Sequence, residues 1–135
     1  MDDVAGGAVV IGRLVSTHTD EFCGSYVDGA GMVVVVLAPS TNEAVWQQRL
    51  ARAAGGLPFR TVRGAASAAE LARLQTELRH FDWPSGRPEH GCFVDVPRCA
   101  VVVQVRSLPE TDKRALARRF GALVVVDEGY RPDRR

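Results

Sequence analysis

The residues whose chemistry is easiest to recognise are His80, His90, Cys92 and Cys99, all in the second half of the chain. Imidazole and thiolate groups bind zinc, and a cysteine activated by a histidine can act as a nucleophile. The four positions match no familiar zinc spacing. His90 and Cys92 share one face if they lie on a strand, but no residue is evident that would orient the imidazole. We therefore treat a small-molecule-binding, metal-dependent or thiol-dependent α+β enzyme domain as the alternative function.

Motifs of the common enzyme classes are absent from the sequence. The chain has no Gly-x-Ser-x-Gly, no Walker phosphate loop, no His-Glu-x-x-His and no Cys-x-x-Cys. Asp28-Gly-Ala-Gly31 resembles a phosphate loop, but it lies between two predicted strands instead of before a helix, so no helix dipole would assist it. The 3 cysteines are an odd number, which argues against a closed disulfide framework. We predict no catalytic residue, no metal and no cofactor.

The composition limits the partners and the location of the chain. Its 135 residues carry a net charge of +1, and the arginines of its predicted helices are interleaved with acidic residues. We therefore expect no nucleic-acid binding and no attraction to anionic membranes. The longest apolar run, 32–38, is far shorter than the ~20 residues of a membrane-spanning helix. Because no signal peptide is recognisable at the acidic start, the chain as it stands is predicted to be cytoplasmic, and secreted if it is a processed fragment.

The element that organises the sequence is a predicted β-hairpin over residues 22–37. Asp28, Gly29 and Gly31 supply its turn, because glycine accepts a positive φ without a steric penalty. The run Val33–Leu37 that follows has no polar alternation. We therefore expect both faces of this strand to be covered.

The segment after the hairpin is predicted to form a helix and then a strand. Ser40 and Glu43 have the spacing of a capping box, which starts the helix. Gly55 ends it, as a left-handed C-cap would. The alternating run Phe59–Arg63 follows as the next strand. The predicted order is therefore strand, strand, helix, strand.

This order recurs in the second half of the chain without a gap. Val27-Asp28 aligns with Val94-Asp95, and a second capping box, Ser107 and Glu110, falls at the same offset as the first. We infer a duplicated unit, whose strand–helix–strand crossover is expected to be right-handed and to place its helix on one sheet face. The predicted turn and cap residues are Asp28, Gly29, Gly31, Ser40, Glu43, Asp95, Ser107 and Glu110.

We predict an α+β fold with two pseudo-repeated β-β-α-β units, joined by a connecting helix and with each sheet packed on helices. A third capping box, Ser67 and Glu70, is predicted to start the connecting helix. The units form a single domain over residues 22–130. The predicted segments are an N-terminal arm 1–21, the first unit 22–64, the connecting helix 67–80, the loop 82–91, the second unit 92–126 and a C-terminal tail 127–135.

Two stretches resemble a recurring pattern of actinobacterial proteins. One is Phe-Cys-Gly-Ser-Tyr-Val-Asp-Gly-Ala-Gly-Met-Val-Val-Val-Val, residues 22–36, and the other is Phe-Val-Asp-Val-Pro-Arg-Cys-Ala-Val-Val-Val, residues 93–103. Both are similar to segments in the pro-regions of secreted chymotrypsin-like serine proteases, of the streptogrisin and alpha-lytic protease type, and of free-standing relatives. The resemblance covers residues 22–126 and depends on short motifs rich in glycine and valine.

In that family the pro-region is not an enzyme. It folds as small α+β units, presents a sheet to its protease, assists folding and then inhibits, with its C-terminal tail in the substrate cleft. For this chain the resemblance implies a non-catalytic protein-binding domain whose binding surface comes from the second half. The implied partner is another protein, a serine protease or an effector, and a homodimer that buries the open sheets is a further hypothesis.

Two places are candidates for the binding surface. Trp83, in the loop 82–91, is either an exposed recognition tip or a tryptophan tucked against the loop base. The start of the tail is the other place, and an extended tail or a sheet edge is a common means of binding a partner. The candidate tail residues are Asp127, Glu128, Gly129, Tyr130 and Arg131.

Overall fold

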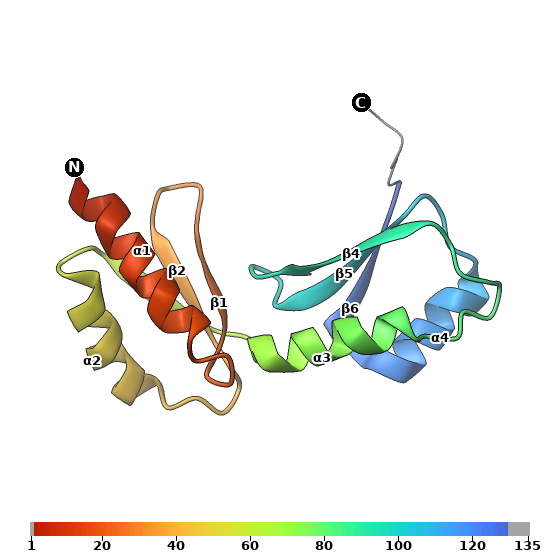
Figure 1. Cartoon of the computed structure of the whole chain (residues 1–135), viewed down its shortest axis with the longest axis horizontal. Coiled ribbons are helices and arrows are strands. Elements are labelled where there is room, and N and C mark those ends of the chain that lie inside the picture. Colours follow the sequence, from red (N-terminus) through yellow and green to blue (C-terminus); the bar gives the residue numbers. More distant parts are fainter. Residues whose placement is uncertain (1, 130–135) are drawn as a thin grey trace. The chain divides into compact units, whose positions relative to one another are not determined.

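The chain is an α+β protein, as predicted, in which one order of elements occurs twice. Figure 1 shows the computed structural model, which describes residues 2–129. The described part contains four α-helices, one short 3-10 helix and six strands in two three-stranded sheets. It divides into two compact units. The first comprises residues up to Glu70 together with the turn Val96–Cys99, and the second comprises Leu71–Asp95 and the residues from Ala100 onward.

The first unit consists of two helices and the sheet β1-β2-β3. Its central strand, β2, pairs antiparallel with β1 and parallel with β3, so α2 is the crossover between parallel neighbours. The elements are α1 (Asp2–Ser16), β1 (Phe22–Val27), β2 (Val33–Leu37), α2 (Glu43–Ala54) and β3 (Phe59–Arg63).

The second unit repeats this topology with the sheet β4-β5-β6. Its central strand, β5, pairs antiparallel with β4 and parallel with β6, and α4 is the crossover. In Figure 1, α3 and α4 lie on the same side of this sheet. The elements are α3 (Ala68–Arg79), β4 (His90–Asp95), β5 (Ala100–Val105), α4 (Glu110–Phe120), the 3-10 helix η1 (Gly121–Leu123) and β6 (Val124–Glu128). The helix α3 is the predicted connecting helix.

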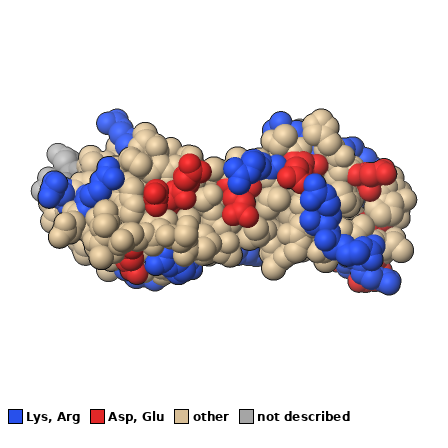
Figure 2. Space-filling view, turned by 90° about the horizontal axis from the view of Figure 1, so that it is seen from below, with Lys and Arg blue, Asp and Glu red and all other residues tan. Residues whose placement is uncertain are grey.

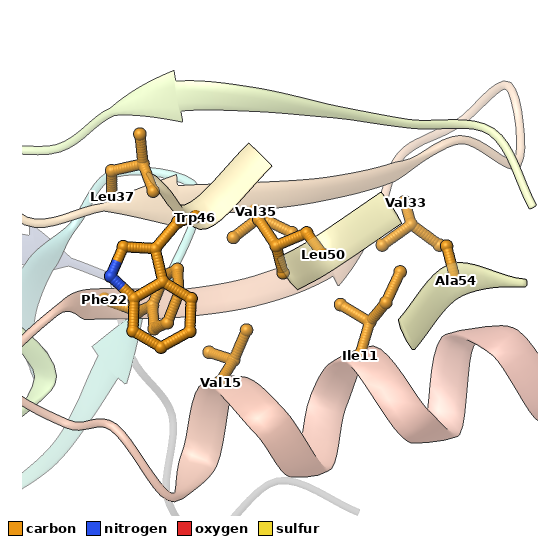
Figure 3. Close-up of a cluster of buried hydrophobic side chains, with 9 residues drawn as sticks. All are labelled: Ile11, Val15, Phe22, Val33, Val35, Leu37, Trp46, Leu50 and Ala54. Atoms are coloured by element: carbon orange, nitrogen blue, oxygen red, sulfur yellow. The ribbon is translucent and has the colours of Figure 1, made fainter. Parts of the chain in front are cut away.

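The core of the first unit forms between the sheet and its two helices. Every residue of β2 is buried, which confirms that both faces of this strand are covered. One face meets α1 and α2, and Trp46 there lies edge-on to Phe22 at 4.8 Å between ring centroids. Figure 3 shows these side chains converging from the two helices and the sheet. The cluster consists of Ile11, Val15, Phe22, Val33, Val35, Leu37, Trp46, Leu50 and Ala54.

The predicted N-terminal arm differs from what the structure contains. Residues 2–16 form α1, and the side chains of Ile11 and Val15 are buried in the core of the first unit. Their spacing of four residues places both on one helical face, which the sheet then covers. No helix among the described residues combines the length and the apolar composition needed to cross a bilayer.

The turn of the first hairpin forms as predicted. The Asp28 carboxylate accepts hydrogen bonds from the backbone N–H groups of Ala30 and Met32, each at 2.9 Å. Gly31 has a φ of 83°, a conformation that glycine adopts without strain. These two bonds, together with the backbone bond from Asp28 to Met32, fix the register of β1 on β2.

The second hairpin does not reproduce that turn, so the prediction of Asp95 as its equivalent is wrong. Asp95 is the last residue of β4 and pairs with Ala100. The turn comprises Val96–Cys99, and Cys99 takes the positive φ, 53°, that Gly31 takes in the first hairpin. The pairing of β4 with β5 extends one residue closer to the turn than the pairing of β1 with β2. Asp95, which corresponds to Asp28, is therefore paired within the sheet.

Two of the three predicted capping boxes are wrong. Asn42, not Ser40, is the N-cap of α2, and its side chain accepts from the Val45 N–H at 3.2 Å. Ser40 lies in a turn in which the Thr41 N–H donates to the Ala38 carbonyl, so the helix begins after this turn. The Glu43 carboxylate instead accepts from the Thr61 hydroxyl at 2.6 Å.

At α4 the N-cap is Pro109, which makes no side-chain hydrogen bond, so Ser107 does not cap this helix. Proline has a fixed φ and no N–H to satisfy, which suits the start of a helix. The Pro109 carbonyl accepts from the N–H groups of Asp112 and Lys113. At α3 the predicted Ser67 cap is confirmed, because its hydroxyl accepts from the Glu70 N–H at 3.1 Å.

The burial of α1 generates a prediction about stability. Replacing Ile11 with alanine should lower the free energy of unfolding by about 2–4 kcal/mol, because it leaves a cavity between α1 and the sheet. Val10, its neighbour on the exposed face at 44% exposure, is the matched control, and Val10→Ala should change stability little. Urea denaturation followed by circular dichroism measures both. Equal effects would mean that α1 does not pack as described.

Candidate functional site

The start of the predicted tail belongs to a strand. The predicted second unit ends at residue 126, but its last strand, β6, runs from Val124 to Glu128 after the short helix η1. Asp127 pairs with Gln104 and Glu128 with Val105, so the prediction that these two residues are free tail residues is wrong. The ladder extends to the last residue of β5. Gly129 follows β6, and the candidates Tyr130 and Arg131 lie outside the described residues.

The end of β6 is held by the side chain of Glu128. Its carboxylate accepts from the Leu108 N–H at 2.9 Å and pairs with the Lys113 ammonium at 3.0 Å. The Lys113 hydrogen bond, reinforced by the Leu108 N–H, lowers the pKa of Glu128. The same hydrogen bond raises the pKa of Lys113. Gly129 adds a backbone bond from its N–H to the Arg106 carbonyl at 3.1 Å. These contacts fasten β6 to the crossover helix.

Trp83 is not the exposed recognition tip considered from the sequence. Only 5% of its surface is exposed, and its ring packs against Phe81 at 5.0 Å and His90 at 5.3 Å between centroids. Its indole Nε1 is buried and has no hydrogen-bond partner among the described residues. Trp83 therefore packs in the interior of the second unit, which agrees with the alternative of a tryptophan packed against the base of its loop.

The loop that carries Trp83 is anchored by a buried acid that the sequence analysis missed. Asp112, in the first turn of α4, has no exposed surface and accepts from the Ser85 hydroxyl at 2.6 Å and the Ser85 N–H at 3.2 Å. The Ser85 hydroxyl bond is the main reason that the pKa of Asp112 is lowered. An acidic residue in the first helical turn was a signal for such a role, since it also faces the positive end of the helix dipole.

The outer strands β3 and β6 occupy corresponding places and differ in charge. Each lies parallel to the central strand of its sheet. β3 carries Arg60 and Arg63, which pair with Asp28 at 3.7 Å and Glu43 at 3.8 Å. Charged side chains on an edge strand discourage the addition of another strand.

β6 lacks that protection over most of its length. It begins with the half-buried valines Val124–Val126, and its first charged residue is Asp127. Among the described residues, β6 pairs with β5 alone, so its other side presents unpaired backbone groups. A partner strand could add to this edge through main-chain hydrogen bonds.

The distribution of charged side chains does not indicate a binding site for a polyanion. On the face drawn in Figure 2, basic and acidic residues are interspersed. Several charged side chains of the described chain pair with one another, as Arg119 does with Glu77. This face offers no field of a single sign that would attract a polyanion.

The two histidines and two cysteines considered for metal or thiol chemistry do not form one site, and only His90 and Cys92 lie together. His80 lines a cavity of about 400 Å³ with Phe81, Arg119 and neighbouring residues. His90 and Cys92 line a different cavity of about 110 Å³. Cys99 is buried in the first unit, where its thiol donates to the Ala66 carbonyl at 3.2 Å. Within residues 2–129, no three potential metal-ligating side chains form a cluster.

No family model matches the chain, and no curated protein or solved structure matches it. The function must therefore be argued from geometry. Two features offer themselves: the open edge of β6, and the small cavity that contains Cys92.

The anchoring of β6 generates a prediction about pH. The folded chain lowers the pKa of Glu128 below its ordinary 4.5, so its stabilisation is present above that value and is lost as the pH falls through the folded pKa. Glu128→Gln should therefore lower the melting temperature at neutral pH, and the difference from the wild type should shrink in strong acid. Asp127→Asn, on the adjacent exposed residue, is the control. Thermal melts across the pH range test this, and a pH-independent difference would contradict it.

Proposed function

We propose that the chain is a non-catalytic protein-binding module that extends its second sheet with a strand from a partner, at the outer edge of β6. The observation that carries the proposal is the contrast between the two corresponding edges. β3 is guarded by Arg60 and Arg63, whereas β6 offers Val124–Val126 without a charge. Main-chain pairing would supply affinity, and the valine side chains would supply apolar contact.

The rigidity of β6 supports this use. Glu128 fixes one end of the strand through Leu108 and Lys113, and β5 pairs along its whole length. An edge that is already extended and held loses little conformational entropy when a partner strand adds to it, and such preorganisation favours binding.

The resemblance to protease pro-regions supplies the class of partner. A chymotrypsin-like serine protease of the streptogrisin or alpha-lytic protease type is the partner that we propose, and the chain would act on it as a folding assistant or inhibitor, as the actinobacterial pro-regions do. By the same resemblance, the C-terminal tail is the segment that we propose for the substrate cleft of the protease. A homodimer formed through the same edge is the competing hypothesis, because an open strand can also pair with a second copy.

Val125→Arg tests the proposal, because it gives β6 the residue that β3 carries at its second position, Arg60. Inhibition of streptogrisin-type and alpha-lytic-type proteases would be measured with a chromogenic peptide. The wild-type chain should inhibit, and Val125→Arg should weaken inhibition roughly tenfold or more, because an unpaired charge would be buried in the interface. Thermal melts would establish that the variant is folded.

Arg60→Val is the matched control, since it removes a charge from the other edge and leaves β6 unchanged. It should inhibit like the wild type. If the wild type inhibits no protease of this class, or if Val125→Arg inhibits equally well, the proposal fails. If sedimentation shows a dimer that Val125→Arg dissociates, while no protease is inhibited, the homodimer takes its place.

A further inference from the structure

A second feature, separate from the β6 edge, is the cavity beside Cys92 within the second unit. It has a volume of about 110 Å³. One wall comes from α3, where the spacing of its residues places them on a single helical face. The opposite wall comes from β4, and the loop between these elements closes one side. The lining residues are Gln75, Leu78, Arg79, Arg87, His90 and Cys92.

The cavity is basic. Arg79 and Arg87 contribute two guanidinium groups, and none of the described residues that line the cavity is acidic. The Arg87 guanidinium donates to the Arg79 carbonyl, which holds this loop side chain against the end of α3. Guanidinium groups bind carboxylates strongly, because their N–H donors match the two carboxylate oxygens.

His90 adds a second kind of group. Its Nδ1 lies 2.8 Å from the Pro88 carbonyl, and since a carbonyl can only accept, Nδ1 carries the proton. In the neutral imidazole the other nitrogen, Nε2, is then free of a proton and can accept one. The Trp83 ring, packed against His90, helps to hold the imidazole in place.

Cys92 is the accessible thiol of the described chain. It is exposed, whereas only 3% of the surface of Cys23 and of Cys99 is accessible. Burial against the cavity wall raises the pKa of Cys92, while the Gln75 side chain and the charge of Arg79 act in the opposite direction. At neutral pH the thiolate is therefore scarce, and a reagent held beside the sulfur has an advantage over one that arrives by random collision.

We infer that this cavity binds the carboxylates of a small anionic disulfide and directs the disulfide to Cys92, which becomes S-thiolated. Cys92 first gives its proton to solvent or to an acceptor such as His90. The resulting thiolate attacks one sulfur of the reagent, the S–S bond of the reagent breaks, and a new S–S bond forms to Cys92. The other half of the reagent leaves as a thiolate, so the disulfide is the oxidant and one equivalent of free thiol is released.

The inference is tested first with two alkylating reagents that differ in charge. Second-order rate constants at Cys92 would be measured by mass spectrometry for iodoacetate, which is anionic, and iodoacetamide, which is neutral. Relative to free cysteine, the wild-type protein should favour iodoacetate. Arg79→Gln and Arg87→Gln should each lower the iodoacetate rate several-fold, up to about tenfold together, with little effect on iodoacetamide.

Arg73→Gln is the matched control, because Arg73 lies exposed on the same helix and does not line the cavity. It should leave both rates unchanged. The disulfide step is then followed with oxidised glutathione, which carries carboxylates, and with cystamine, which is cationic. Oxidised glutathione should modify Cys92 faster than cystamine in the wild type, and the double arginine variant should reverse that preference.

Two results would overturn the inference. One is a ratio of iodoacetate to iodoacetamide rates equal to that of free cysteine. The other is an equal effect of Arg79→Gln and Arg73→Gln. A melting temperature within the wild-type range would show that each variant is folded, and Cys92→Ser should abolish the labelling. Neither measurement depends on the β6 edge, so the fate of this inference is independent of the proposed protein-binding function.

Discussion

The constraint on which the structure depends is that each unit is built around a strand with apolar side chains on both of its faces. In β2 every residue is buried, and in β5 only Gln104 is more than slightly exposed. A strand of this kind needs a neighbour along each edge and cover over each face, because its backbone groups and side chains must both leave water. The antiparallel hairpin partner and the parallel third strand supply the two edge neighbours, and the crossover helix covers one face, so the β-β-α-β order meets most of this requirement.

The two units share one order of elements, but their outer strands, β3 and β6, carry different side chains. Arg63 in β3 reaches back and donates to the carbonyls of Ala38 and Thr41, each at 2.8 Å, so the charge that guards this strand also fixes the connection into α2. In the second unit the connection into α4 is fixed by Glu128, at the far end of β6. Arg63 and Glu128 are both the last residues of their strands, so the two edges differ at the second position, where β3 has Arg60 and β6 has Val125.

Much of the fold could be predicted from the sequence, because in those segments the local sequence pattern and the tertiary packing favour the same secondary structure. The runs Val33–Leu37 and Phe59–Arg63 are strands with the predicted bounds, and Gly55 ends α2 in the left-handed conformation. The wrong predictions were those that depended on short capping motifs. Ser40 and Ser107 have capping spacing, but the turn before α2 and the proline before α4 decide where those helices start.

The candidate sites were harder to predict, because they depend on contacts between distant segments. The extension of β6 through Asp127 and Glu128 is set by the length of β5 and by Lys113, neither of which the tail sequence reveals. Gln75 and Arg79, four residues apart, could be placed on one face of α3 from spacing alone. Nothing in the sequence indicates that Arg87, in a loop rich in turn formers, lies beside them.

The placement of the 2 tryptophans has a practical consequence. Trp46 is packed in the core of the first unit against Phe22, and Trp83 is buried in the second unit against Phe81. Each half of the duplication thus contains its own intrinsic fluorophore in a distinct aromatic environment. Variants that retain a single indole would let the emission of each half be followed separately, so that the cooperativity between the two copies becomes an optical measurement.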